Sequence, residues 1–231
     1  MTGGSRERIS GTYRSVNLKL NFMYEKKDKK PGEKKTGLTP ISALGEFGLI
    51  DRLTAPVRLY HPSTLKGIGD DAAVIDAGDR VILLSTDLLM EGVHFDLTYM
   101  PFKHLGYKAA VVNISDIAAM NGIPRQMTFS LAVSSRFSAE ALDELYAGLL
   151  AACDKYRVDL VGGDTSANVQ GLAISVSITG DAHKDEVVYR SGARPGDLLC
   201  VTGDLGSAYI GLLILEREKA VFKADPDMQP D

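Results

Sequence analysis

Aspartates recur in this chain beside glycine, serine or threonine, at points where apolar segments are expected to meet loops. They are the pair Asp70 and Asp71, followed by Asp87, Asp116 and Asp164. A single acid of this kind is usually a turn or capping residue, but several that gather in space repel one another unless a cation neutralises them. Mg²⁺ binds carboxylate oxygens and usually also holds substrate phosphates. The pattern therefore predicts a magnesium site for a phosphorylated substrate.

Glycine pairs beside these acids could supply the other half of a phosphate site. Gly162-Gly163 and Gly67-Ile-Gly69 each directly precede one of the aspartates. A backbone without side chains lets N–H groups approach an anion closely. His94 and Arg190 are candidate partners for the anion because each stands beside an expected loop. An isolated histidine or arginine is more often a structural or surface residue. The residues alone therefore leave open whether His94 and Arg190 bind an anion.

Missing motifs exclude several other chemistries. The chain has no Gly-x-x-x-x-Gly-Lys-[Ser/Thr] loop and no His-Arg-Asp motif of protein kinases. Its two cysteines and four histidines are too scattered for zinc spacing. Both cysteines, Cys153 and Cys200, lie in apolar segments and are too few for a disulfide framework. We expect both to be reduced core residues, and the protein to be cytoplasmic.

The charge of the chain is unevenly distributed. Residues 1–40 hold 10 of the 26 lysines and arginines but only 4 of the 30 acids, so the rest of the chain is acidic. An acidic body argues against a nucleic-acid-binding surface. No apolar run approaches the roughly 18 residues that a membrane-spanning helix needs. We therefore expect no nucleic-acid partner and no membrane span.

The elements that must position the acids form an alternating pattern. Ser138 is a favourable N-cap, and the apolar spacing after it predicts a helix to Tyr156. Helices are also expected over 44–53, 103–120 and 207–218, and strands over 72–75, 81–84, 127–133, 158–161, 172–178 and 198–201. Several strands follow one another directly. This order predicts an α+β fold in which helices cover one face of a mainly antiparallel or mixed sheet.

Six motifs occur in the order that is typical of one enzyme family. They are Leu44-Gly-Glu-Phe-Gly-Leu-Ile50, Gly67-Ile-Gly-Asp-Asp71, Ser85-Thr-Asp87 with Glu91-Gly-Val-His-Phe95, Lys108-Ala-Ala-Val-Val-Asn-Ile-Ser-Asp116, Val161-Gly-Gly-Asp-Thr165 and Arg190-Ser-Gly-Ala-Arg-Pro-Gly-Asp197. Over about residues 41–218 the chain resembles the thiamine-monophosphate kinases, which belong to the superfamily of aminoimidazole ribonucleotide synthase. Another enzyme of that superfamily, for purine or selenophosphate synthesis, is the less favoured alternative.

The resemblance implies a reaction and the residues that perform it. The reaction is ATP-dependent phosphorylation of thiamine monophosphate to thiamine pyrophosphate, by direct in-line transfer in a site with several Mg²⁺ ions. The implied metal ligands are Asp71, Ser85, Thr86, Asp87, Asp116 and Asp164, with Ser85 and Thr86 acting through hydroxyl or backbone oxygens. The implied ATP contacts are Tyr146, Gly163, Asp164 and Arg190, and His94 is the implied contact of the thiamine phosphate.

The resemblance also implies a domain organisation. We expect a disordered basic tail over 1–40, an N-terminal Mg/ATP-binding and dimerisation domain over 41–183, and the truncated start of a second α+β domain over 184–231. The family forms homodimers through the sheet of the first domain. Its second half carries Ser-Asp-Gly and Gly-Gly-Glu-Asp motifs that these residues lack. The alternative to a complete kinase is therefore a non-catalytic fragment that dimerises and binds Mg-nucleotide weakly.

Overall fold

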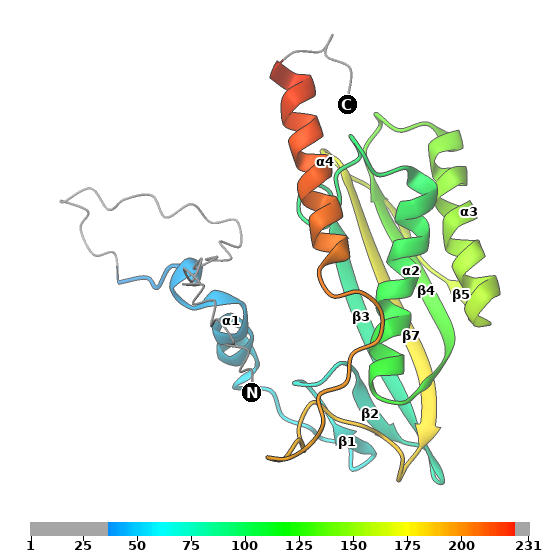
Figure 1. The fold of residues 1–231 in the computed structure, drawn as a ribbon. Coiled ribbons are helices and arrows are strands. Elements are labelled where there is room, and N and C mark those ends of the chain that lie inside the picture. The colour runs from blue at the N-terminus through cyan, green and yellow to red at the C-terminus, as the bar shows by residue number, and fades with distance from the viewer. Residues whose placement is uncertain (1–36, 225–231) are drawn as a thin grey trace, which may run out of the picture. The chain divides into compact units, whose positions relative to one another are not determined.

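The computed structural model describes residues 37–224, so most of the predicted basic tail lies outside the described residues (Figure 1). The chain divides into two units, Met1–Val57 and Arg58–Asp231. In the first unit, a 3-10 helix at Ile41–Ala43 precedes helix α1, Gly45–Thr54. This confirms the predicted helix. Taken by itself α1 buries none of its residues, and Phe47 is 73% exposed.

The second unit is built around a seven-stranded mixed sheet. Its strands are β1 (Thr64–Lys66), β2 (Ala73–Asp76), β3 (Arg80–Met90), β4 (Ile123–Val133), β5 (Asp159–Gly162), β6 (Thr165–Ala167) and β7 (Leu172–His183). The order is β1-β2-β3-β7-β4-β5, and β6 also pairs with β4. Only β5 and β6 run parallel to their neighbour β4, and the other pairs are antiparallel. The predicted α+β class is confirmed.

Two long helices, α2 (Phe102–Ala119) and α3 (Ala139–Tyr156), lie together on one face of this sheet (Figure 1). Ser138 caps α3 as predicted, because its side chain accepts a hydrogen bond from Ala141 N. The two helices approach closely at a pair of glycines. A Cβ atom added to Gly106 would lie 1.9 Å from the Leu145 carbonyl oxygen, and one added to Gly148 would lie 1.8 Å from that of Lys103.

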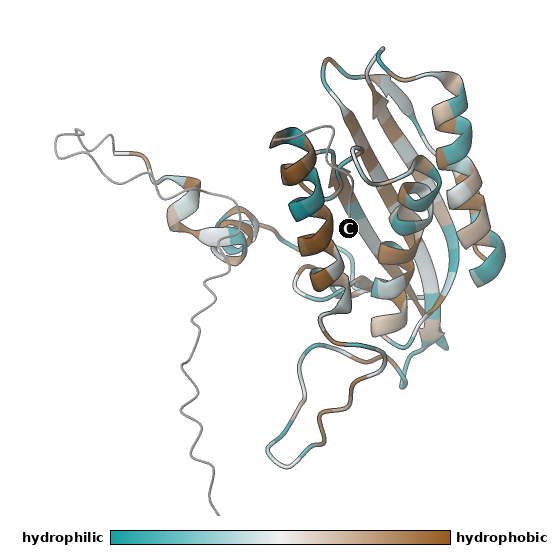
Figure 2. Ribbon diagram, turned by 45° about the horizontal axis from the view of Figure 1, so that its top comes forward, coloured by the Kyte–Doolittle hydropathy of each residue, from teal (hydrophilic) through white to brown (hydrophobic). Residues whose placement is uncertain are grey.

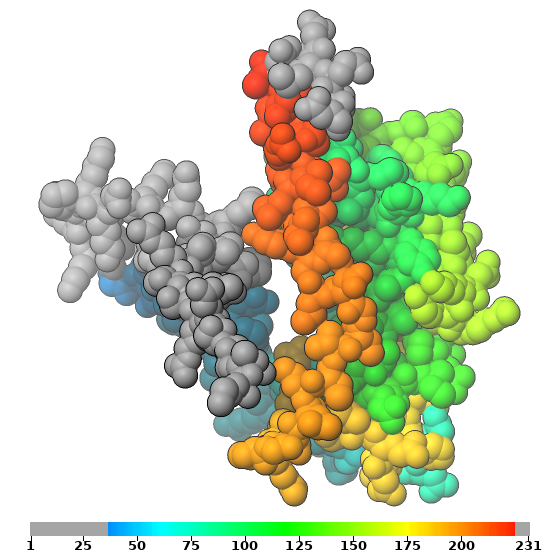
Figure 3. All heavy atoms as spheres, viewed as in Figure 1, coloured from blue at the N-terminus to red at the C-terminus, as the bar shows by residue number. Residues whose placement is uncertain are grey.

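Helix α4 (Ser207–Ala224) confirms the last predicted helix, and it carries hydrophobic bands without burying any residue (Figure 2). The segment before it, residues 191–206, is exposed throughout (Figure 3). The strand predicted over 198–201 is wrong, because this segment pairs with no described strand and Leu199 is 96% exposed. The prediction of a core position for Cys200 is wrong for the same reason, since its thiol is free and exposed.

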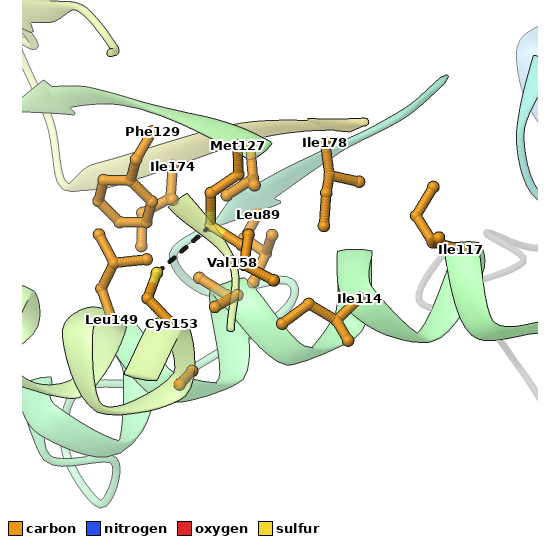
Figure 4. Close-up of a cluster of buried hydrophobic side chains, with 14 of the residues drawn as sticks. Leu89, Ile114, Ile117, Met127, Phe129, Leu149, Cys153, Val158, Ile174 and Ile178 are labelled. Carbon is orange, nitrogen blue, oxygen red and sulfur yellow. Dashed lines mark hydrogen bonds between the residues drawn. The ribbon is translucent and has the colours of Figure 1, made fainter. Parts of the chain in front are cut away.

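The core fills the layer between the sheet and the two helices. Along β7 the side chains alternate between buried and half-buried, as the period of a strand with one covered face requires. Figure 4 shows Phe129, Met127 and Ile178 from the sheet facing Leu149 and Cys153 of α3 and residues of α2. The predicted burial of Cys153 is confirmed, and its Sγ lies 4.0 Å from Met127 Sδ.

Two of the acids do not stand where an element meets a loop. Asp87 lies inside β3, because the ladder with β7 continues through Ser85, Thr86 and Asp87 as far as Met90. Asp116 lies inside α2, three residues before its end. The polar residues are therefore held by regular backbone hydrogen bonds. Among the described helices, none is both long and apolar enough to cross a membrane.

Candidate active site

Four of the predicted metal ligands interact at the seam between β3 and α2. Asp87 comes from β3, Asp116 from α2, and Asp71 from the loop that joins β1 to β2. The Ser85 hydroxyl donates a hydrogen bond to Asp116 Oδ2 over 2.8 Å, which ties the strand to the helix. Asp116 interacts electrostatically with both Asp87 and Asp71. We call Asp71, Ser85, Asp87 and Asp116 the acid cluster.

The surroundings of the Asp116 carboxyl group shift its pKa. Burial raises its pKa above the ordinary value, because a charged carboxylate is poorly solvated there. The hydrogen bond from Ser85 lowers the pKa, and the negative charges of Asp87 and Asp71 raise it again. The net effect is a raised pKa, with burial as its largest cause.

The donor set of the acid cluster fits Mg²⁺ that is held together with a substrate. Within residues 37–224, no group of three or more histidine, cysteine or carboxylate side chains is close enough to hold a metal ion by itself. Mg²⁺ usually takes only one or two protein carboxylates and completes its shell with water and substrate phosphates. The acid cluster offers hard oxygen ligands and an excess of negative charge, which matches that mode of binding.

The structure brings Arg190, a predicted ATP contact, to the acid cluster. Its guanidinium forms an ion pair with Asp71, and Nε lies 3.1 Å from Asp71 Oδ1. Its backbone N–H donates to Asp70 Oδ1 over 3.3 Å. The positive charge also lowers the pKa of Asp116 and so offsets part of the repulsion between the carboxylates.

The hydroxyl group of Thr86 is not brought to the acid cluster. Its Oγ1 donates to the Val176 carbonyl oxygen over 2.9 Å and accepts from Ser177 Oγ over 3.1 Å, both on β7. Successive side chains of a strand point to opposite faces, so Thr86 lies on the other face of the sheet from Ser85 and Asp87. Of the two Thr86 oxygens that could bind a metal ion, only the backbone carbonyl oxygen therefore remains a candidate.

Three of the predicted ATP contacts lie together in a second place, an open cavity of about 480 Å³. The lining residues are Phe129, Tyr146, Leu160, Val161, Gly162, Gly163, Asp164 and Thr165. The Tyr146 ring packs edge-to-face on Phe129 with centroids 5.5 Å apart. Gly163 is required by packing, because a Cβ there would lie 1.9 Å from the Phe129 carbonyl oxygen.

The cavity and the acid cluster are separate in the described structure. Asp164 follows β5, whereas Asp87 lies on β3, and β7 and β4 stand between these strands. Three strand spacings correspond to roughly 14 Å. The predicted metal ligand Asp164 is therefore placed with Tyr146 and Gly163 rather than with the other carboxylates. A ligand that used both places would have to be elongated.

His94 occupies a third place, in a tight turn directly after β3. Gly92 adopts a positive φ of 79°, a conformation that residues with a side chain rarely adopt. Its N–H donates to the Phe95 carbonyl oxygen over 2.8 Å. The imidazole folds back so that Nδ1 accepts from Met90 N over 2.9 Å. Phe95 is buried in the core, whereas His94 is exposed. The turn thus fixes the ring and leaves Nε2 available to a ligand.

Sequence reasoning missed the residues that hold this turn. Glu91 accepts a hydrogen bond from Leu172 N over 2.9 Å and pairs with Arg136. Lys108 of α2 donates from Nζ to the His94 carbonyl oxygen over 2.7 Å. Glu91 and Lys108 both belong to motifs that the sequence analysis identified. Their positions in those motifs could have marked them as candidate site residues.

Comparison with known proteins agrees with this architecture. The family described as AIR synthase related protein, N-terminal domain, matches residues 69–182. The thiamine-monophosphate kinase of Bacillus subtilis (strain 168) is 41% identical over 176 residues, which are 76% of this chain and 54% of that protein. The one from Aquifex aeolicus (strain VF5) is 37% identical over 183 residues, which are 79% of this chain and 56% of that protein.

A solved structure gives the same result in three dimensions. The protein described as AaThiL complexed with AMPPCP and TMP aligns with a TM-score of 0.70 at 36% identity, and the alignment covers 78% of this chain and 55% of that one. The chain spans about half the length of the curated relatives it matches. By its fold and its sequence, the chain is homologous to about half of the thiamine-monophosphate kinase chain.

Proposed function

We propose that this chain carries the metal- and nucleotide-binding part of an enzyme that phosphorylates thiamine monophosphate with ATP, giving thiamine pyrophosphate. The observation that carries the proposal is the acid cluster, where carboxylates from three different elements interact electrostatically. Such an arrangement costs stability unless a cation binds. The relative described with AMPPCP and TMP supports the choice of the two substrates.

In this proposal, protein side chains position charges and take no covalent part. Phosphoryl transfer depends mainly on positioning and on electrostatic stabilisation. Asp71, Asp87 and Asp116 would hold Mg²⁺, and the Ser85 hydroxyl keeps the Asp116 carboxylate oriented. When bound, Mg²⁺ would neutralise the phosphate charges and so reduce the repulsion between the two anionic substrates. We propose direct in-line transfer, with an oxygen of the acceptor phosphate as nucleophile.

The cavity would hold the nucleotide at a distance from the metal. Tyr146 offers an aromatic face next to Phe129, Gly163 offers exposed backbone, and the Asp164 carboxylate would bind a metal ion or a hydroxyl group there. Arg190 lies at the acid cluster, so we propose that it contacts the phosphate end of ATP. His94 would donate from Nε2 to the phosphate of thiamine monophosphate.

The test is transfer of label from [γ-³²P]ATP to thiamine monophosphate in the presence of Mg²⁺. We expect labelled thiamine pyrophosphate and no label on denatured protein. Asp87→Asn should abolish product formation, whereas Asp79→Asn should not, because Asp79 is an exposed acid in the turn before β3. Label that stays on the protein would contradict direct transfer. Binding of Mg·ATP without any product would favour the alternative of a non-catalytic nucleotide-binding module.

We further propose a homodimer that uses the sheet face opposite to α2 and α3. On that face β3 presents Ile82, Leu84, Leu88 and Met90, which are 38–57% exposed. Such a row of apolar side chains on a strand is typical of an interface. Light scattering should give a dimer for the wild type and a monomer for Leu84→Glu. A monomeric wild type would contradict the proposal.

We place the protein in the reducing cytoplasm, because Cys200 is a free, exposed thiol.

A further inference from the structure

Lys108 is a cation whose surroundings differ from those of the other charged residues near the site. It lies on α2 with a half-buried side chain, and its Nζ donates to the His94 carbonyl oxygen over 2.7 Å. An ammonium group has three N–H donors, so this one hydrogen bond leaves two for another acceptor.

The charge of Lys108 has no carboxylate partner within the part of the chain that the structure describes. Ion pairs there include Arg190 with Asp71 and Lys219 with Asp96, but none of them involves Lys108. Burial lowers the pKa of its ammonium, since a charged group loses solvation there. A partly desolvated cation without a counter-ion favours the binding of an anion.

The neighbouring histidine is oriented for the same kind of ligand. Because His94 Nδ1 accepts from the Met90 N–H, a neutral ring carries its proton on Nε2. Nε2–H is then a hydrogen-bond donor on an exposed residue. One neutral donor does not neutralise a phosphate dianion, so a cation beside it is needed, and Lys108 contacts the same residue.

The position of Lys108 also separates it from the acid cluster. It precedes Asp116 on α2 by eight residues, which correspond to about 12 Å along a helix. Ser85 contacts Asp116 at one end of the seam, and the turn after Met90 contacts Lys108 at the other. The seam therefore has a negative end suited to Mg²⁺ and a positive end suited to a phosphate.

We propose that Lys108, together with Nε2–H of His94, binds the phosphate group of the acceptor and so selects a phosphorylated acceptor over the free alcohol. This inference rests on the proposed function for the identity of the acceptor. Lys108 is then a substrate-binding residue and does more than hold the turn in place.

The experiment measures binding to the full chain by calorimetry, with thiamine monophosphate, unphosphorylated thiamine and inorganic phosphate as ligands. Lys108→Gln removes the charge, Lys108→Arg keeps it, and Lys103→Gln removes an exposed charge from the same helix as a matched control. Charge-assisted hydrogen bonds lead us to expect a loss of about 10- to 100-fold for thiamine monophosphate and inorganic phosphate in Lys108→Gln. Lys108→Arg should restore most of the affinity, and Lys103→Gln should match the wild type.

The outcomes separate this inference from the proposed function. Equal losses for thiamine and thiamine monophosphate in Lys108→Gln would show that Lys108 only supports the turn, which would overturn the inference. Unchanged phosphate affinity, or no phosphate binding by the wild type, would overturn it as well. If phosphate binding depends on Lys108 but thiamine monophosphate binds no tighter than phosphate, the anion site stands and the assignment of thiamine monophosphate as acceptor fails.

Discussion

Helix α2 takes part in two regions that are built in opposite ways. Towards α3 and the sheet it packs apolar side chains and one glycine so closely that a single added methyl group would collide with backbone. Towards β3 and the loop after β1 it presents Asp116 to two further carboxylates, and the pKa of Asp116 is raised. The first region stabilises the fold, whereas we expect the second to cost stability without a ligand. Strain of this kind is expected where a site is kept for binding.

The largest effect should come from filling the contact between the two helices. Gly148→Ala places a Cβ 1.8 Å from the Lys103 carbonyl oxygen, so the helices must move apart. We expect a loss of about 3 kcal/mol in the free energy of unfolding, measured by urea denaturation. Gly211→Ala in α4 is the matched control, because nothing lies within 4 Å of its added Cβ. It should leave stability unchanged or raise it by up to about 1 kcal/mol. Similar losses for both variants would contradict the account of the contact.

A change in the acid cluster should have the opposite sign. Asp116→Asn removes the disfavoured charge but keeps an oxygen that can accept from Ser85. In the absence of Mg²⁺ we expect the variant to be more stable than the wild type by about 1 kcal/mol at pH 7. Its affinity for Mg·ATP should fall at the same time.

The gain from Asp116→Asn should depend on pH in a defined direction. The folded-state pKa of Asp116 is raised, so the cost of its charge is present above that pKa and absent below the ordinary value of about 4. Thermal unfolding between pH 8 and pH 3.5 should show the gain shrinking as the pH falls. If Asp116→Asn were less stable than the wild type at pH 7, the negative charges of the acid cluster would already be compensated in the fold without a ligand.

The smallest effect concerns an acid whose charge is compensated. Asp181 on β7 pairs with Arg125 and Arg80, and the hydrogen bond from Arg125 lowers its pKa. Asp181→Asn should therefore cost stability above the ordinary pKa of about 4, with the difference closing as the pH falls through the lowered folded-state value. Because the arginines are partly exposed, about 0.5 kcal/mol is expected at pH 7. An unchanged difference at pH 2.5 and pH 7 would rule out the ion pairs as its cause.

The sequence was most informative where one physical constraint dominates. Apolar spacing and the Ser138 cap predicted α3, because a helix on a sheet must bury one face. The strand predicted over 198–201 failed because a short apolar run forms a strand only where a partner strand exists, and this segment pairs with no described strand. Asp87 was expected at a strand end, since local patterns do not reveal that β7 pairs with β3 over its whole length.

The candidate site was predictable residue by residue but not in its grouping. The motifs pointed to the acids, to Tyr146 and to His94, yet the order of the strands decides which of them meet. The separation of Asp164 from Asp87 follows from the two strands between β3 and β5. The proposed role of Lys108 depends on one contact between a helix and a turn 14 residues earlier in the chain. Pairings of this kind are long-range and leave no local pattern.

The most direct test of the central claim is ATP binding with and without Mg²⁺, measured by calorimetry on the wild type and on Asp87→Asn. If the acid cluster holds the metal that carries the nucleotide phosphates, ATP should bind the wild type at least tenfold more tightly with Mg²⁺, and Asp87→Asn should lose that gain. Equal ATP affinity in the presence of a chelator, or a full Mg²⁺ effect in Asp87→Asn, would contradict the account.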